Sequence, residues 1–381
     1  MIRDMGIKAA TSFSLKDQLF NADSVALLAA ALARAQPGFA RARFERAVLA
    51  RFPELELKQR IQWLVTNLEN RLPGDFPQAL EVLRRALPAP LDPTLRDDDF
   101  GQFIWVVPGE YVAKHGCKDS HLAASLAFLR EATMRFSSES ALRPFLQRYP
   151  QATLRFVHAC AEDANYHVRR LASEGIRPFL PWALRVQLPP AEVVAVLDKL
   201  HADPTRYVTR SVANTLNDVS RVDPALALET LRRWHVAGVQ RPEELGWMTR
   251  HALRTLVKQG DAATLALLGF DASPQFRLSG IKTSRQVRVG DVFEWRASLR
   301  AATSQRLRID LRLHFLKSNG RHLPKVFSIA DASVEAGETL AIHKRLRLQP
   351  ATTRTLYPGK HFAELVVNGA TSHRSSFELI I

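Results

Sequence analysis

Three carboxylates lie in short motifs whose residue types could support cleavage of a glycosidic bond. Glu139 occurs in "SSESALRPFL", Glu174 in the related motif "SEGIRPFL", and Asp218 further along in "TLNDVS". A carboxylate beside a bound sugar can stabilise the oxocarbenium-like cation that forms as the bond breaks, and it can direct a water molecule. We therefore predict that these three residues are catalytic.

Each of the three carboxylates also has a structural interpretation. Glu174 could form an ion pair with Arg170, which precedes it by one helical turn. Glu139 could complement the N-terminus of a helix that follows two serines, and Asp218 could end its helix. The sequence leaves both kinds of interpretation open.

Arginines recur at intervals of about forty residues on one predicted helical face. Arg170, Arg210 and Arg250 occupy equivalent places in "HVRRLASEG", "YVTRSVANT" and "WMTRHALRT". Because the apolar stripe of each helix should be buried, the opposite face should line a groove, where arginine suits phosphate oxygens. The alternative is an Asp–Arg ladder between repeats, but its arginine directly follows the valine, as Arg169 does. The candidate nucleic-acid-binding residues are Arg170, Arg177, Arg210, Asn214 and Arg250.

Trp182 follows one of these motifs directly, after "RPFLP". At the rim of a basic groove, a tryptophan can stack on a base or attract a cationic group to its ring face. The alternative is that Trp182 belongs to the core between repeats. The sequence favours neither interpretation over the other.

The motifs belong to a long helical region. From residue 14 to about residue 270, short amphipathic segments are separated by Pro, Gly or Asp-Pro. Self-similarity between 163 and 260, with a period of about forty residues, predicts helix pairs stacked as a solenoid of HEAT-like repeats. The interruption at 87–116 is long, and loops of such length are commonly functional.

After "GFDASPQ" the pattern changes to alternation of apolar and polar residues, as in "LRIDLRLHFL" and "HFAELVVNG". About seven short strands separated by turn signals predict one immunoglobulin-like β-sandwich without a disulfide. The expected fold class is therefore multidomain, α then β. A HEAT-like α-helical repeat solenoid is expected at 1–272 and an immunoglobulin-like β-sandwich at 273–381.

The charge of the chain is positive and unevenly distributed. The 381 residues carry a formal net charge of +15, and residues 273–381 contain 18 Lys and Arg against 8 Asp and Glu. A positive potential concentrates polyanions, so this composition favours a nucleic-acid partner. Solubility alone is the alternative, but it does not require the excess to gather in one part of the chain.

Motifs for several other classes of protein are missing from the sequence. Two cysteines make no disulfide framework, and no apolar run reaches the ~20 residues of a membrane span. The run at 24–33 lacks the basic flank of a signal peptide. We therefore expect a cytoplasmic protein with no membrane partner. Neither a metal nor a nucleotide cofactor is indicated, since HExxH, CxxC, Walker and GxGxxG motifs are missing.

Three segments, "DANYHVRRLASEGIRPFLPW", "DPTRYVTRSVANTLNDVS" and "FIWVVPGEYVAKHG", resemble the AlkC-type DNA alkylation repair glycosylases. These are relatives of AlkD built from HEAT-like repeats, and some members carry a C-terminal immunoglobulin-like domain. The resemblance therefore covers the whole chain. The chain departs from the family pattern at Phe179, a position that is often basic.

The resemblance implies a monofunctional DNA glycosylase that needs no cofactor. Such an enzyme removes 3-methyladenine and related cationic bases from duplex DNA by hydrolysis of the N-glycosidic bond, without a covalent intermediate. The resemblance places Glu139, Glu174 and Asp218 at the acidic active-site positions. It also places Trp182 against the lesion and implies that the sandwich binds DNA. A groove that admits duplex DNA argues for a monomer.

Two other functions are compatible with the same fold and charge. The first is a non-catalytic HEAT-repeat scaffold that binds DNA without releasing a base. The second is a protein-interaction adaptor whose basic sandwich docks an acidic partner. Base release separates the glycosylase from the scaffold, and affinity for duplex DNA separates both from the adaptor.

Overall fold

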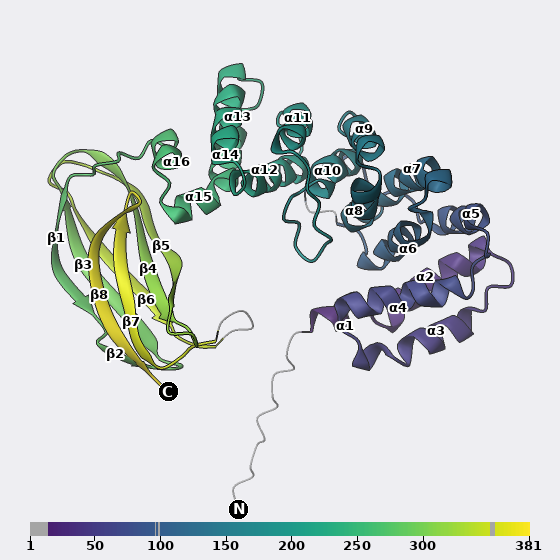
Figure 1. The fold of residues 1–381 in the computed structure, drawn as a ribbon, viewed down its shortest axis with the longest axis horizontal. Helices are drawn as coiled ribbons and strands as arrows, with labels where there is room; N and C mark the ends of the chain where they lie inside the picture. The colour runs from purple at the N-terminus through teal and green to yellow at the C-terminus, as the bar shows by residue number, and fades with distance from the viewer. Residues whose placement is uncertain (1–13, 96, 98–99, 351–354) are drawn as a thin grey trace, which may run out of the picture. The chain divides into compact units, whose positions relative to one another are not determined.

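The computed structural model describes residues 14–95, 97, 100–350 and 355–381, which form two compact units (Figure 1). The first unit extends through Leu226 and includes Thr230–Thr249, and the second comprises Ala227–Glu229 and Arg250–Ile381. Helices build the first unit, and two short helices precede the strands of the second. The predicted fold class, helical repeats followed by a β-sandwich, is confirmed.

The first unit consists of short helices that follow one another in a row. Asn21, Asp75 and Asn165 cap the helices that follow them, because each side chain accepts a hydrogen bond from a backbone N–H group of the first turn. The helices are α1 (Leu15–Leu19), α2 (Ala22–Ala35), α3 (Arg41–Leu49), α4 (Leu57–Glu69), α5 (Phe76–Ala86), α6 (Val106–Gly116), α7 (Leu122–Thr133), α8 (Glu139–Arg148), α9 (Pro150–Cys160), α10 (Tyr166–Gly175), α11 (Pro190–Leu200), α12 (Arg206–Ser220), α13 (Pro224–Ala237) and α14 (Pro242–Ala252), of which α14 ends in the second unit.

Neighbouring repeats are joined by arginine–aspartate pairs. The Nε atoms of Arg130 and Arg169 each donate to an aspartate of the next repeat, Asp163 and Asp203 respectively, at 2.6 Å. Both aspartates also accept a backbone N–H group two residues later, which shapes the turn before the next helix. The ladder that the sequence raised as an alternative therefore exists, and Arg169 rather than Arg170 belongs to it.

The expected long interruption at 87–116 is shorter in the structure. Its last eleven residues form α6, which packs against α8. Pro108 lies in the first turn of α6, where its missing N–H group is not needed. At Gly109 the two helices approach closely, because an added Cβ atom would lie 3.4 Å from the Cβ atom of Ala141. The Pro-Gly pair is thus compatible with a helix here, although it reads as a turn in sequence.

The strands of the second unit form two sheets with a shared core. The three-stranded sheet has the order β1-β3-β6, and the five-stranded sheet has the order β2-β8-β7-β4-β5, in which β2 is parallel to β8. Burial alternates along β3 and β4, so Phe293, Trp295 and Leu311 point into the core while polar residues point out. The elements are α15 (Arg254–Gln259), α16 (Ala262–Leu267), β1 (Phe276–Thr283), β2 (Gln286–Arg288), β3 (Val292–Ala301), β4 (Gln305–Leu316), β5 (His322–Val334), β6 (Thr339–Arg347), β7 (Gly359–Val367) and β8 (Ala370–Ile380).

The division between the units lies earlier in the chain than the predicted boundary between 272 and 273. Helices α15 and α16 belong to the same unit as the strands. The Nη1 atom of Arg306 donates to the carbonyl of Leu268 at 2.9 Å, and the Nδ2 atom of Asn368 donates to that of Asp271 at 2.9 Å. Sequence periodicity shows where helices end, but it does not show which core they pack against.

The two units have no helix suited to a lipid bilayer. In the part of the chain that the structure describes, every helix is too short or too polar to span a membrane.

Candidate active site

Glu174 lies at the end of α10 and is held there by hydrogen bonds from two side chains. The apolar stripe predicted for this helix is confirmed, since Val168 and Leu171 are fully buried. The helix ends at Gly175, because the prolines of "RPFLPW" follow it, so Arg177 lies beyond the helix. Glu174 is only 5% exposed, and it accepts hydrogen bonds of 2.7 Å from the Oγ atom of Ser211 and the Nη1 atom of Arg177.

Asp218 lies near the end of α12 and is joined to Glu174 through Arg177. The Nε atom of Arg177 donates to the Oδ2 atom of Asp218 at 3.0 Å, and the backbone N–H group of Phe179 donates to the same oxygen at 3.2 Å. Arg177 is 8% exposed and Asp218 is 2% exposed. One buried guanidinium group therefore bridges two carboxylates from different helices.

Glu139 is joined to Glu174 through Arg170. It is the first residue of α8, where the sequence allowed a role at a helix N-terminus. The Nη1 atom of Arg170 donates to the Oε2 atom of Glu139 at 3.3 Å and to the Oγ atom of Ser137 at 2.6 Å. The Nη2 atom of Arg170 lies 3.7 Å from the Oε2 atom of Glu174. The side chain of Glu139 keeps 23% of its surface exposed, more than either of the other two carboxylates.

The structure thus brings together all three predicted catalytic carboxylates and two of the predicted nucleic-acid-binding arginines. We call this group the carboxylate cluster: Glu139, Glu174, Asp218, Arg170 and Arg177. The prediction that Arg177 lines an open groove needs correction, because Arg177 is buried in the cluster, as Glu174 is. A helical wheel locates the polar face, but the next repeat covers part of it.

A further arginine holds the backbone beneath the carboxylate cluster. Arg143 is fully buried in α8 and donates to the carbonyl oxygens of Gly175 and Arg177 at 2.8 and 2.9 Å. These two carbonyls belong to the chain that leaves α10, so Arg143 fixes the turn that carries Arg177. Burial lowers the pKa of Arg143 to about 10, which leaves the side chain charged at neutral pH.

The environments of Glu139 and Glu174 move their pKa values in opposite directions. Burial acts to raise the pKa of Glu174, but the guanidinium groups of Arg170 and Arg177 outweigh it and hold this pKa below its usual value. Burial raises the pKa of Glu139, and the negative charge of Glu174 adds to this effect, while Arg170 opposes it. Two neighbouring carboxyl groups with separated pKa values can take different roles in one reaction.

Glu110 is a fourth carboxyl group that the sequence did not single out. It lies in α6 and is half-buried. Burial raises the pKa of Glu110, the charge of Glu139 raises it further, and Lys58 acts in the opposite direction. In the sequence, only its place as a lone glutamate in the apolar run "VVPGEYVA" could have singled it out. Its proximity to Glu139 arises because α6 packs against α8.

Trp182 is exposed on the chain segment between α10 and α11. Its side chain is 72% exposed, which excludes the alternative that it belongs to the core. Its backbone adopts φ of 61°, a left-handed conformation that non-glycine residues rarely take. Lys58 of α4 donates to the carbonyl of Trp182, and Arg143 donates to the carbonyl of Leu184, so side chains from two helices hold this segment.

The remaining predicted nucleic-acid-binding residues have different surroundings. Arg210 forms an ion pair with Asp97 at 2.6 Å and keeps 35% of its side chain exposed. Asn214 is half-buried one turn later on α12. Arg250 is exposed and belongs to the second unit. Equivalent spacing in the sequence therefore does not give the three recurring arginines equivalent partners.

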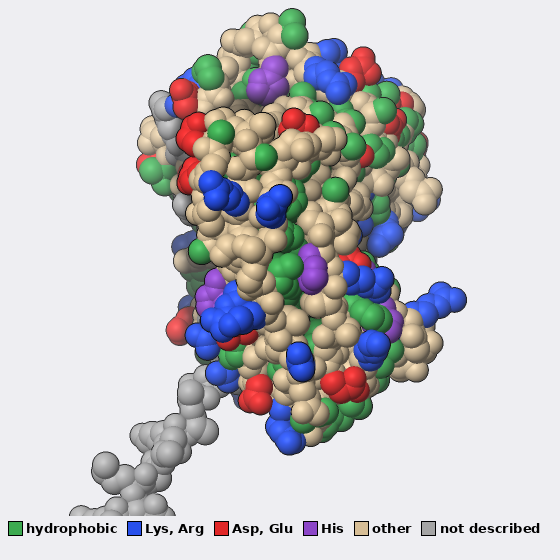
Figure 2. Space-filling model, turned by 90° about the vertical axis from the view of Figure 1, so that its left-hand side faces the viewer, with side chains coloured by type: hydrophobic (Ala, Val, Ile, Leu, Met, Phe, Trp, Pro, Cys, Tyr) green, Lys and Arg blue, Asp and Glu red, His purple; other side chains and the backbone are tan. Residues whose placement is uncertain are grey.

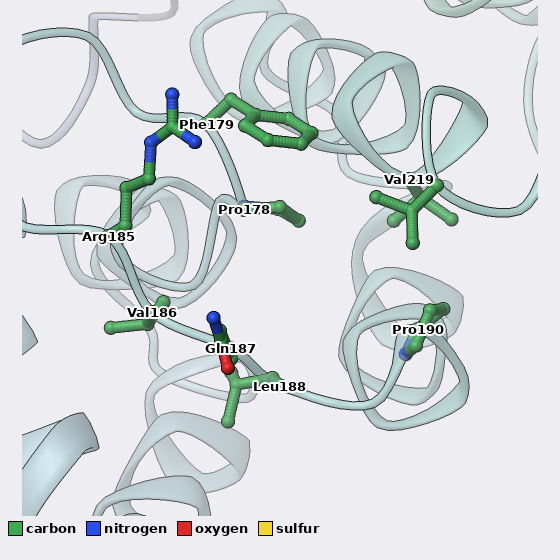
Figure 3. A pocket seen from close by; sticks show the side chains of 9 residues that line it. Pro178, Phe179, Arg185, Val186, Gln187, Leu188, Pro190 and Val219 are labelled. Atoms are coloured by element: carbon green, nitrogen blue, oxygen red, sulfur yellow. The ribbon is translucent and has the colours of Figure 1, made fainter.

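An apolar pocket lies between the chain segment that links α10 to α11 and the end of α12 (Figure 3). Its volume is about 260 Å³, and its wall includes Pro178, Phe179 and Val219. The ring of Phe179 is flanked by guanidinium groups, with the Cζ atom of Arg221 at 4.1 Å from its centroid. The backbone N–H group of Phe179 contacts Asp218 while its ring lines the pocket. The position that is often basic in the family is thus apolar but has arginine beside it.

The described residues contain no group of three or more His, Cys, Asp and Glu side chains arranged to hold a metal ion. The three carboxylates of the cluster are instead paired with two arginines. A solenoid of HEAT-like repeats with buried, arginine-bridged carboxylates, followed by an immunoglobulin-like sandwich, is the class of protein that the fold and the site define.

Comparisons with known proteins agree with this class. Residues 278–381 match the family model described as "Uncharacterised protein YhaZ, C-terminal Ig-like domain". The protein YhaZ of Bacillus subtilis (strain 168) is 30% identical over 367 residues, which cover 95% of this chain and 98% of that protein. The Pseudomonas fluorescens alkylpurine DNA glycosylase AlkC, solved bound to DNA containing an abasic site analog, is 32% identical with a TM-score of 0.86. That match covers 97% of this chain and 100% of the AlkC chain. The chain belongs to the AlkC-type family of DNA glycosylases.

Proposed function

We propose that this protein is a monofunctional DNA glycosylase that removes N-alkylated, cationic bases such as 3-methyladenine from duplex DNA. The bond that breaks is the N-glycosidic bond, a water molecule supplies the oxygen that ends on the sugar, and the base leaves as a neutral molecule. The observation that carries this proposal is the linkage of Glu139, Glu174 and Asp218 through two arginines in a chain that matches AlkC over nearly its whole length.

The chemistry requires stabilisation of the sugar more than activation of the base. An alkylated base already carries positive charge and is a good leaving group, so no strong acid is needed. As it departs, positive charge develops on the deoxyribose, and fixed carboxylates nearby lower the energy of that state. Arg177 supports this role because it holds Glu174 and Asp218 in one geometry, and its charge helps to hold the pKa of Glu174 below its usual value.

Asp218 is the carboxylate that we assign to the attacking water. Both the Arg177 side chain and the Phe179 backbone donate to its Oδ2 atom. This arrangement orients the Oδ1 atom as the acceptor for a proton of the water molecule. Glu174, with its lowered pKa, supplies a permanent negative charge, and Glu139 supplies a charge that depends on pH.

Contacts with DNA are assigned to exposed side chains rather than to the buried arginines. We assign Trp182 to the lesion; its exposure, on a segment held by Lys58 and Arg143, supports this assignment. Arg210 and Asn214 on α12 are assigned to the DNA backbone in the first unit. The sandwich contributes through its positive charge, so we expect DNA binding to weaken steeply as salt rises.

Base release from methylated duplex DNA tests this proposal directly. Full-length protein is expected to release free 3-methyladenine in the presence of a chelator and without added nucleotide. No step of the proposed reaction requires a metal ion or a nucleotide. Chromatography of the released bases across 3-methyladenine, 3-methylcytosine and 7-methylguanine substrates provides the measurement. Tight binding of the methylated duplex without release of any base would instead support the non-catalytic scaffold.

Glu139→Gln is expected to make the protein more stable and less active at neutral pH. Because burial raises the pKa of Glu139, the folded state binds its proton more tightly than the unfolded state does. The wild type therefore loses stability as pH rises above the unfolded pKa of about 4.3. The glutamine variant has no charge at this position and keeps its stability. Thermal unfolding should show a higher Tm for the variant at pH near 8, a difference that disappears near pH 4.

The same variant should change the pH profile of base release. In the wild type, kcat/KM should rise as Glu139 loses its proton, and this limb should be missing from Glu139→Gln. Glu162→Gln is the control, because Glu162 lies on the surface and the hydrogen bond from Lys199 lowers its pKa. An unchanged acidic limb in the Glu139 variant would remove this residue from the mechanism.

A further inference from the structure

The second unit contains a cavity in which basic side chains converge. Its volume is about 120 Å³, and it lies between α15, the chain around Phe270, and strands β4 and β5. Every residue that lines it belongs to this one unit. Five of the nine lining residues are basic and one is acidic: Arg250, Arg254, Lys258, Arg306, Arg308 and Asp331.

Two of these guanidinium groups are fixed in place by aspartates. The Nε and Nη2 atoms of Arg306 each donate to Asp331 at 3.0 Å, and the guanidinium lies over the ring of Phe270 at 4.5 Å. Arg308 forms a similar pair with Asp310, at 2.9 and 3.0 Å. Because a guanidinium group carries five N–H donors, both arginines keep donors for a further acceptor.

The remaining charges leave the cavity strongly positive. Arg250 and Lys258 are exposed at its edge. Among the described residues, five cations line the cavity, against Asp331 in its wall and Asp310 beside Arg308. On the face shown in Figure 2, Lys and Arg side chains stand in small groups separated by uncharged and acidic side chains. The cavity therefore concentrates positive charge in a hollow of the size of a small anion.

A second cavity continues from the first along the same strand. Its volume is about 620 Å³, and Lys258 lines both cavities. Arg312 and His314 of β4 line the second one, together with Lys325 of β5. Outward-facing residues of a strand recur about every 6.8 Å, so β4 presents a row of polar and mostly basic side chains from one cavity to the next.

We propose that the smaller cavity binds one phosphate group of a DNA backbone, and that the same DNA strand continues along β4 through the larger cavity. A phosphate is tetrahedral and offers several acceptor oxygens, so it can satisfy converging guanidinium and ammonium groups from different elements, and arginine forks match it well. A side-chain carboxylate has two oxygens in one plane and fits such a cluster less completely. The inference rests on the proposed function and extends it to a defined anchor in the second unit.

Binding of undamaged duplex DNA by the full-length chain tests this site. The probe is a fluorescein-labelled duplex, and anisotropy is measured across a sodium chloride series. The test variant is Arg250→Gln/Lys258→Gln, which removes the two exposed cations and leaves the aspartate-paired arginines in place. The matched control is Lys282→Gln/Arg345→Gln, which removes two exposed cations from β1 and β6 and changes the net charge equally.

The test variant should bind the duplex roughly tenfold or more weakly, and its plot of log K against log salt should be shallower by about one. The control should bind within about twofold of the wild type, since it alters only the general field. Equal weakening in both variants, or no weakening in either, would overturn the phosphate site. Competition by polyglutamate as strong as that by unlabelled duplex would assign the cavity to an acidic protein and also overturn it.

These outcomes are separable from those that test base release. Undamaged DNA contains no alkylated base, so the site can be present in a protein that releases none, and that result would refute only the proposed glycosylase activity. Conversely, a test variant that behaves like the control in a protein that releases 3-methyladenine would refute only the phosphate site.

Discussion

Glu174→Gln is expected to lower kcat/KM for base release by at least about 100-fold, the scale of losing one preorganised electrostatic group in an active site. The substitution keeps the shape of the side chain, and the amide can still accept from Arg177 and donate to the Oγ atom of Ser211, but it removes the negative charge. Single-turnover release of 3-methyladenine measures the chemical step. Because Glu174 is only 5% exposed, binding of methylated DNA should change little.

Glu244→Gln is a closely matched control for this variant. Glu244 is also 5% exposed, and it likewise accepts from a hydroxyl group, that of Thr209, and from an arginine, Arg206. It lies outside the carboxylate cluster, so the same substitution should have a similar structural cost without loss of activity. Comparable rates for the two variants would show that Glu174 serves only to hold the repeats together.

Arg177→Met is expected to cost about 3–5 kcal/mol of stability, because it leaves two buried carboxylates without their shared cation. For a unit of this size, that loss corresponds to a fall in Tm of roughly 10 °C. Thermal unfolding at pH near 8 and near 5 gives the measurement. The deficit should shrink at the lower pH, because without the charge of Arg177 the pKa of Glu174 in the folded state should rise, so that this state takes up a proton more readily.

Arg169→Met separates the cost of a lost ion pair from an effect on the site. Arg169 pairs with Asp203, whose side chain is 2% exposed, and therefore its loss also leaves a buried carboxylate. We expect this variant to be destabilised but to release bases at the wild-type rate per folded molecule. Arg177→Met should lose activity as well, since Glu174 and Asp218 lose their common partner. A stable Arg177→Met protein with full activity would contradict the role given to the cluster.

Much of the candidate site could be predicted from the sequence, because its motifs repeat. The similarity of the segments around Glu139 and Glu174 pointed to both carboxylates, and the period of about forty residues led to Asp218. Glu110 was not predicted, since it lies in an apolar run that resembles an ordinary core helix. Only the packing of α6 against α8 brings it next to Glu139.

The direction of side chains was harder to predict than their presence. Arg169 and Arg170 are adjacent, yet one joins the repeats through Asp203 and the other joins Glu139 to Glu174. Successive helical residues differ by 100° in direction. An error of one residue in aligning the repeats therefore assigns the role of one of these arginines to the other. The recurring arginines at 170, 210 and 250 therefore look equivalent in sequence but have different surroundings. Arg170 pairs with two glutamates, Arg210 pairs with Asp97, and Arg250 lines the basic cavity.

The sequence by itself determined the order of helical repeats and strands, the basic character of the chain, and the candidate residues of the site. These are local properties, because periodicity and composition can be recognised within a short window. The tertiary structure alone decided which charges pair, which are buried, and that α15 and α16 belong with the sandwich. Those properties depend on contacts between residues far apart in the chain, such as Arg177 with Asp218, and no local pattern encodes such a distance.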